Sequence, residues 1–133
     1  MSKLAFLVLL AVLPVACLSS DFEDSLQGSW QLTSGSVDGA EISLIPSHPI
    51  TITLDEEEVN GTAACNGFNG GFDLSGSSIS FQNLSITEMA CFPPEVMDLE
   101  MTFMDALTRV TTVTIDDGLV LSGPDIELSF EAG

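Results

Sequence analysis

The chain has 133 residues and a formal net charge of −18, with 20 acidic residues against two basic ones. So acidic a surface repels phosphate backbones and anionic lipid headgroups, which excludes nucleic acid as a partner. The length suits one domain with one core, and no linker or internal repeat divides it.

The chain begins with the pattern of a secretory signal peptide. Lys3 precedes an unbroken apolar run over residues 4–16, and polar, acidic residues follow at once. As a helix this run rises only about 20 Å, too short for the roughly 30 Å hydrocarbon core of a membrane. We therefore interpret residues 1–16 as a signal peptide that is removed from the mature protein.

The end of this run is similar to a bacterial lipobox, in which a small residue precedes a cysteine that is lipidated. Ala16-Cys17 fits that pattern, whereas Pro14 stands where leucine is usual, so cleavage by a general signal peptidase is the alternative. We predict lipidation at Cys17 and a lipid-anchored tether over residues 17–25. Two or more acyl chains would anchor the protein stably to a membrane, since one chain binds only marginally.

Short segments rich in β-branched and aromatic residues then recur between turn signals. Residues 50–54 (ITITL) alternate apolar and polar side chains strictly, which is typical of a strand with one buried face. The predicted strands cover residues 29–33, 50–54, 59–64, 72–74, 79–81, 110–115, 119–121 and 126–130. The pattern predicts a mainly β domain of about eight antiparallel strands over residues 26–133.

One segment has helical spacing instead. After two prolines, apolar residues stand at positions 96, 99, 103, 106, 107 and 110. Proline suits the first turn of a helix, and acids at positions 95 and 98 favour the positive end of its dipole. A single helix among so many strands predicts a twisted, partly closed, cone-like or barrel-like sheet with the helix packed against it.

Two patterns leave a metal-handling protein, for copper or calcium, as an alternative. Met97, Met101 and Met104 lie together on the predicted helix, and such stripes can coordinate copper(I). Adaptable packing at the border of the core is the favoured interpretation. Residues 55–58 (DEEE) could capture calcium, but they lack the spaced oxygens and turning glycine of a calcium loop. We expect neither a metal nor a cofactor.

Residues 61–76 (GTAACNGFNGGFDLSG) contain five glycines. A phosphate-binding loop would lead into a helix and a P-loop would carry a lysine, and this stretch predicts neither. The Asn-Gly pairs at 66–67 and 69–70 accept a positive φ, so we expect the chain to reverse or bulge there. Phe68 and Phe72 would then return to cover apolar surface.

Two cysteines remain if Cys17 carries lipid. An exported domain meets an oxidising environment, in which Cys65 and Cys91 are expected to pair as a disulfide. Free buried thiols and a catalytic or metal-binding thiol are the alternatives. A cysteine nucleophile needs a nearby histidine base, and the single histidine, His48, lies in a predicted loop.

These motifs together resemble the META domain (HslJ-like) family of small bacterial exported proteins. Residues 26–32 (LQGSWQL) match its L-x-G-x-W-x-L opening, and residues 61–72 match its G-x-x-x-C-N-x-[FY]-x-G-x-[FY] core. Residues 87–91 (TEMAC) match its T-x-M-A-C signature, and the helix after them fits as well. The resemblance covers residues 26–131, with Ala64 standing where glycine is common.

The resemblance implies a cone-like antiparallel sheet with one helix, and it brings no enzymatic assignment or catalytic residues. Family members are linked loosely to heat response, antibiotic tolerance and secretion or motility. We therefore expect a non-catalytic lipoprotein of the bacterial cell envelope, facing the periplasm or exterior. It would bind an envelope protein or a small apolar ligand. A hydrolase is a weaker alternative, because the mature chain lacks lysine and tyrosine and has one histidine.

The residues that we expect to matter are structural. Asn66 is expected to serve a turn conformation. The structural motif positions are Trp30, Asn66, Gly67, Phe68, Gly70, Phe72 and Met89. The predicted core comprises Trp30, Phe68, Phe72, Phe81, Leu99 and Phe103.

Overall fold

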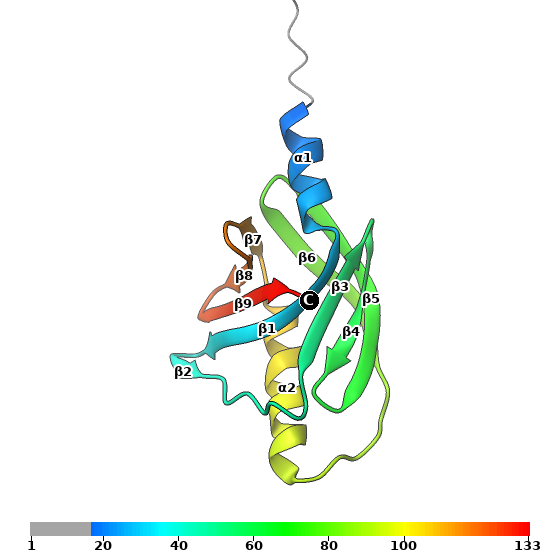
Figure 1. Cartoon of the computed structure of the whole chain (residues 1–133), viewed down its shortest axis with the longest axis vertical. Helices are drawn as coiled ribbons and strands as arrows, with labels where there is room; N and C mark the ends of the chain where they lie inside the picture. Colours follow the sequence, from blue (N-terminus) through cyan, green and yellow to red (C-terminus); the bar gives the residue numbers. More distant parts are fainter. Residues whose placement is uncertain (1–16) are drawn as a thin grey trace, which may run out of the picture.

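The computed structural model describes residues 17–133 (Figure 1). The predicted signal peptide, residues 1–16, lies outside the described residues. The elements are α1 (Cys17–Leu26), β1 (Gly28–Val37), β2 (Ala40–Glu41), β3 (Ile50–Asp55), β4 (Glu58–Ala63), β5 (Asn66–Ser75), β6 (Ser78–Ile86), α2 (Pro94–Thr108), β7 (Thr112–Ile115), β8 (Leu119–Gly123) and β9 (Ile126–Ala132). The predicted mainly β fold is confirmed. The described residues form nine strands rather than eight, because the two-residue β2 carries no recognisable pattern.

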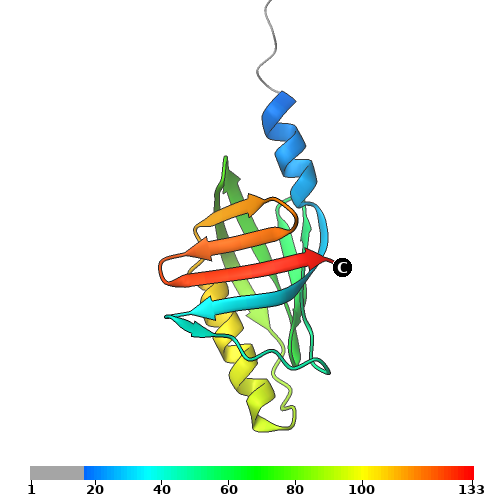
Figure 2. The ribbon, with the colours of Figure 1, turned by 60° about the vertical axis from the view of Figure 1, so that its left-hand side comes forward.

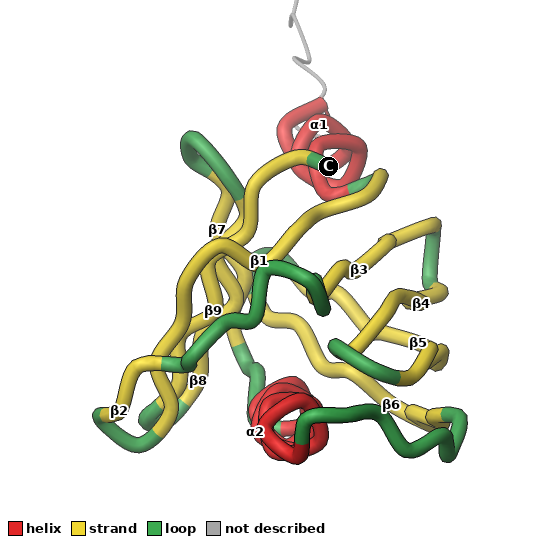
Figure 3. Tube along the Cα trace, turned by 60° about the horizontal axis from the view of Figure 1, so that its bottom comes forward, coloured by secondary structure: helices red, strands yellow, loops and turns green. Residues whose placement is uncertain are grey.

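The sheet forms a ring because β1 pairs along both of its edges. Residues 28–31 of β1 pair with β3, and residues 30–37 pair with β9, all antiparallel. The thinnest join is between β6 and β7, where Ser78 and Thr112 are the one residue pair in register. Figure 2 shows the β7–β8–β9–β1 face, and Figure 3 shows α2 lying between β8 and β6.

α2 packs on the sheet through the apolar face that the spacing predicts. Its buried residues include Val96, Leu99, Phe103, Ala106 and Leu107. The ring of Phe103 meets that of Phe68 of β5 edge to face, with centroids 5.8 Å apart. Burying aromatic rings of this size contributes on the order of 2–3 kcal/mol each.

Five of the six predicted core residues are buried, and Trp30 is the exception. Its indole is half-buried, and Nε1 donates a 3.0 Å hydrogen bond to the carbonyl oxygen of Leu26 at the end of α1. Leu26 is itself fully buried, and Phe22 one turn earlier packs against the core. Residues 17–25, which were predicted to be a tether, belong to helix α1. A helix advances about 1.5 Å per residue along its axis, whereas an extended chain advances ~3.5 Å, so this segment reaches less far than an extended tether would.

In the glycine-rich stretch, the chain reverses immediately before residues 66–67, where the sequence predicted the reversal. Ala64 and Cys65 form the turn between β4 and β5, and Ala64 adopts a φ of 64°. Residues 66–67 belong to β5, and neither has a positive φ. The prediction of a reversal there is wrong, because the left-handed conformation falls on Ala64. The motif that this stretch resembles commonly has glycine here, and glycine adopts this conformation without strain.

Other glycines of this stretch allow strands to approach closely. The register between β5 and β6 shifts between Asn69 and Gly71, which confirms the predicted bulge. A Cβ on Gly70 would lie 2.8 Å from the carbonyl oxygen of Gln82. A Cβ on Gly61 would overlap the carbonyl oxygen of Thr51. Close backbone approach, rather than a positive φ, therefore requires glycine at these two positions.

Gly61→Ala is expected to lower the free energy of unfolding by about 2 kcal/mol, because β3 and β4 must separate to admit the methyl group. Gly67→Ala is the matched control: the atom nearest to its added Cβ is the Gly61 carbonyl oxygen at 3.8 Å. That variant should change stability by less than about 0.5 kcal/mol. Urea unfolding of both variants tests this, and equal midpoints would contradict it.

Arg109 joins the end of α2 to two hairpin turns. Its guanidinium contacts the carboxylate of Asp38 at 2.7 Å and that of Asp105 at 3.4 Å, and it donates to the carbonyl oxygen of Pro124 at 3.2 Å. The hydrogen bond from Arg109 is the main reason that the pKa of Asp38 lies below its usual range. Burial opposes this shift, and the charge of Arg109 adds to it.

This ion pair predicts a small, pH-dependent contribution to stability. The pKa of Asp38 is lower in the folded than in the unfolded chain, so the contribution is present above the unfolded value of about 4 and is lost as pH falls through the folded value. Asp38→Asn should therefore lower the unfolding midpoint slightly at pH 7 and by less at pH 3. Asp116→Asn, on an exposed turn, is the control. A difference between wild type and Asp38→Asn that grows on acidification would refute this account.

Candidate functional site

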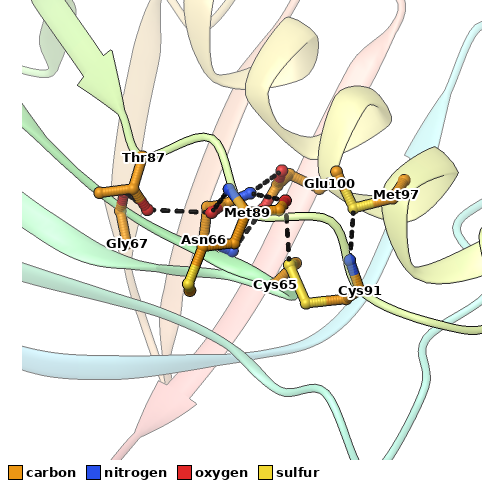
Figure 4. The surroundings of a disulfide bond; sticks show 8 residues. All are labelled: Cys65, Asn66, Gly67, Thr87, Met89, Cys91, Met97 and Glu100. Carbon is orange, nitrogen blue, oxygen red and sulfur yellow. Dashed lines mark hydrogen bonds between the residues drawn. A yellow bond between two sulfur atoms is a disulfide. The ribbon is translucent and has the colours of Figure 1, made fainter.

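The predicted disulfide is present and joins the turn between β4 and β5 to the segment before α2 (Figure 4). The Cα atoms of Cys65 and Cys91 lie 5.9 Å apart, and the two residues are 26 positions apart in the chain. The backbone N–H of Cys91 donates to Sδ of Met97 at 3.5 Å. Because both sulfurs are bonded to each other, neither serves as a free thiol nucleophile or metal ligand in this state.

Asn66 makes a second connection at the same place. Its Nδ2 donates to the carbonyl oxygen of Met89 at 3.0 Å, and its Oδ1 accepts from the Met89 N–H at 2.7 Å. Oδ1 also accepts from the Thr87 hydroxyl at 2.9 Å. Asn66 is 1% exposed, so its amide group is shielded from water, while its partners Thr87 and Met89 are exposed residues. The side chain thus holds the 87–91 segment against β5, which corrects the expectation that Asn66 serves a turn conformation.

Glu100 of α2 completes this arrangement. Its carboxylate is buried, with Oε1 accepting from the backbone N–H of Asn66 at 2.6 Å and Oε2 accepting from Asn66 Nδ2 at 2.9 Å. In the described chain, no cation pairs with this carboxylate. We use the name clasp for the six residues that tie β5, the 87–91 segment and α2 together: Cys65, Asn66, Thr87, Met89, Cys91 and Glu100.

The sequence prediction missed the roles of Glu100 and Thr87. Glu100 stands on the apolar stripe of the helix, four residues after Val96 and three before Phe103. An acid on a buried face needs hydrogen-bond donors, so its position is a signal that could have been noticed. Thr87 belongs to the T-x-M-A-C signature, but its partner could not be predicted, because its hydroxyl meets Asn66 only through the pairing of β5 with β6.

The remaining motif residues have backbone or packing roles. Gly67 is exposed beside Asn66, Phe68 and Phe72 are buried from the inner face of β5, and Gly70 lies at the bulge. Met89 contributes its backbone to the clasp, and the residue is 59% exposed. The motif residues therefore hold β5, the 87–91 segment and α2 together, and some of them, such as Gly67 and Met89, are exposed at the surface.

The methionines of α2 lie at and beyond the border of the core. Met97 and Met104 are half-buried, and Met104 packs against the core, whereas Met101 is 69% exposed. This arrangement suits adaptable packing for two of the three side chains.

An acidic cleft of about 1240 Å³ surrounds the DEEE turn between β3 and β4. Seven carboxylates line it, from Glu23, Asp24, Asp55, Glu56, Glu57, Glu58 and Asp73. Among the side chains that the structure describes, no group of three or more His, Cys, Asp or Glu comes close enough to hold a metal ion. The structure thus places three further acids, Glu23, Asp24 and Asp73, beside the run at residues 55–58.

His48 lies in a turn, where its backbone N–H donates to the carbonyl oxygen of Ile45 at 2.9 Å. Among the side chains described over residues 21–133, no hydrogen bond joins its ring to a serine or a carboxylate. The geometry therefore gives a Ser-His-Asp arrangement no support.

An apolar groove of about 600 Å³ runs between α2 and the segment that connects β1 to β3. One wall is the α2 stripe of Glu95, Asp98, Leu99 and Thr102, and the other is the stretch from Ala40 to Ile45. Val37 completes the lining. Ile42, Leu44 and Ile45 are half-buried, so they present apolar surface to the groove.

The family model of the META domain matches residues 23–131, which is most of the chain. The chain belongs to the META domain family. Heat shock protein HslJ of Escherichia coli (strain K12) is 28% identical over 119 residues, covering 86% of this chain and 84% of HslJ. The resemblance seen in the motifs is thus confirmed.

Solved structures share the fold of this META domain. A Burkholderia xenovorans protein determined by NMR has a TM-score of 0.68 and 28% identity, covering 83% of this chain and 85% of that one. A DUF4847 family protein from Bacteroides vulgatus ATCC 8482 has a TM-score of 0.61 at 13% identity, covering 84% and 96% of the two chains. At that identity the second likeness shows the fold alone.

Proposed function

We propose that this META domain protein is a non-catalytic, lipid-anchored binding module of the bacterial cell envelope that contributes to stress tolerance. The Cys65–Cys91 disulfide is the observation that carries the proposal. Disulfides persist in oxidising compartments and are rare in the cytosol, so the bond fits an exported protein. The signal-peptide pattern of residues 1–16 and the lipobox-like Cys17 are two further features that support export, and neither depends on the disulfide.

The positions of α1 and of the start of α2, at opposite ends of the molecule (Figure 1), suit an anchored binding module. α1, which would carry the lipid, lies at one end of the molecule, and the first turn of α2 lies at the other (Figures 1 and 2). Phe92, 83% exposed beside the disulfide, and the half-exposed Met89 belong to the segment leading into α2. An anchor at Cys17 would therefore direct this apolar tip away from the membrane, toward a partner. Among the described residues, no helix combines the length and apolar character that membrane crossing demands.

Membrane fractionation of a Cys17→Ala variant tests the anchor. The wild type should sediment with membranes and incorporate labelled fatty acid, whereas Cys17→Ala should appear in the soluble envelope extract with its Cys65–Cys91 bond intact. Ser19→Ala, two residues further on, is the matched control and should remain in the membrane. A soluble wild-type protein with an N-terminus other than Cys17 would refute the anchor.

The stress role is tested by a deletion strain. Loss of the protein should reduce survival at elevated temperature and raise envelope permeability, and expression of the wild type should restore both. The motive is the similarity to heat shock protein HslJ. Unchanged survival and permeability in the deletion strain would argue against this part of the proposal.

A further inference from the structure

We propose that the apolar groove binds a cationic amphipathic peptide segment, which places its apolar face in the groove and its lysine or arginine side chains on the acidic rim. The inference deepens the binding role proposed above and rests on it.

The lining of the groove is mainly apolar, whereas acidic residues are exposed along its rim. The half-buried side chains of Ile42, Leu44 and Ile45 supply apolar surface, while Glu41, Glu95 and Asp98 of the lining are exposed. In the described part of the chain, none of these three carboxylates forms an ion pair or a side-chain hydrogen bond. They are therefore free to meet cationic groups on a ligand.

This combination selects against other ligand classes. Fatty acids and phospholipids are apolar but carry anionic groups, which the rim would repel. A purely cationic ligand would leave the apolar floor exposed to water, whereas a ligand with one apolar and one basic face satisfies both parts of the surface. The acidic cleft near the DEEE turn offers charge, but its lining is mainly carboxylates.

The α2 wall has the dimensions of a helix-binding surface. Glu95, Asp98, Leu99 and Thr102 are spaced i, i+3, i+4 and i+7, so they form one stripe about 10 Å long. An amphipathic helix that is laid along such a stripe contacts it through its own i, i+3, i+4 and i+7 positions. Two helical turns of a partner are therefore enough to follow this wall.

The probe is a short amphipathic helical peptide composed only of leucine and lysine. Its binding is measured by surface plasmon resonance to the full processed protein in phosphatidylcholine nanodiscs, with empty nanodiscs as the reference. A scrambled peptide of the same composition and a leucine–glutamate analogue are the ligand controls. Both controls should bind about tenfold more weakly or less, because they lack either the segregated faces or the positive charge.

Matched variants locate the site. Glu95→Gln/Asp98→Asn should weaken binding about tenfold through the loss of two ion pairs, while Asp116→Asn/Asp117→Asn removes the same charge from an exposed turn and should leave binding unchanged. Leu44→Ser should also weaken binding, and Ile86→Ser, which removes an exposed apolar side chain from β6, should not. Thermal unfolding of each variant verifies that the fold is retained.

Three outcomes would overturn the proposal. They are no peptide binding, equal weakening by both charge-removal pairs, or binding of a neutral apolar dye to the groove without binding of the peptide. Equal weakening would mean that the overall negative charge, rather than the groove, attracts the peptide. Membrane fractionation of Cys17→Ala reports on anchoring separately, so a negative peptide result leaves the envelope assignment standing.

Discussion

Asn66→Ala is expected to lower the free energy of unfolding by about 4 kcal/mol, the largest effect of any single substitution considered for this protein. The Asn66 side chain takes part in four hydrogen bonds, with the backbone of Met89, the hydroxyl of Thr87 and the carboxylate of Glu100. Each buried group left without its partner loses on the order of 1–3 kcal/mol. Urea unfolding monitored by the fluorescence of Trp30 measures the change.

Two further variants distinguish the loss of the Asn66 hydrogen bonds from the loss of side-chain volume. Glu100→Gln keeps the size of the side chain but replaces one acceptor by an amide donor that faces the N–H groups of Asn66, so about 2 kcal/mol should be lost. Asn60→Ala removes an asparagine that is exposed on β4 and should change stability by less than about 0.5 kcal/mol. If Asn66→Ala unfolded at the same urea concentration as Asn60→Ala, the clasp would not be a source of stability.

Removing the disulfide is expected to lower the free energy of unfolding by about 3 kcal/mol. Cys65 and Cys91 close a loop with a sequence separation of 26, and the chain-entropy model gives this magnitude for a loop of that length. The Cys65→Ala/Cys91→Ala variant measures the loss directly by chemical unfolding. The loop contains β5 and β6, so the unfolded chain gains freedom over much of the domain when the bond is absent.

A reducing agent supplies the control for this prediction. Dithiothreitol should destabilise the wild type to about the level of the double alanine variant and should leave the variant itself unchanged. A wild type that is insensitive to reductant while its thiols react with an alkylating agent would show that the bond does not stabilise the fold. The hydrogen bonds of Asn66 would then hold the 87–91 segment alone.

The clasp and the groove lie on different parts of α2. Glu100, at the clasp, is directed toward β5, whereas Glu95 and Asp98 line the groove beside the segment from Ala40 to Ile45. The clasp therefore fixes the helix that forms one wall of the proposed binding surface. Stable positioning of that wall would be the physical connection between the META motif and the proposed binding role.

Several features could be predicted from local patterns. Alternation of polar and apolar residues identified β3, and helical spacing identified α2 together with its buried face. The cysteine count, with Cys17 assigned to the predicted lipid, predicted the Cys65–Cys91 pair, and the motif order predicted the family. Each of these features depends on residues near one another in the chain or on the total composition.

Local patterns and composition were thus enough to predict the class of fold, the elements with strong periodicity, the disulfide and the family. The ring closure of β1 on β9, the left-handed turn at Ala64, the buried contact of Asn66 with Glu100 and the groove beside α2 became visible only in the folded chain. Periodicity indicates which face of an element is buried, but it does not indicate which distant group lies opposite that face. Hydrogen-bond partners, close backbone approach and surface hollows arise only when elements far apart in the chain are packed together.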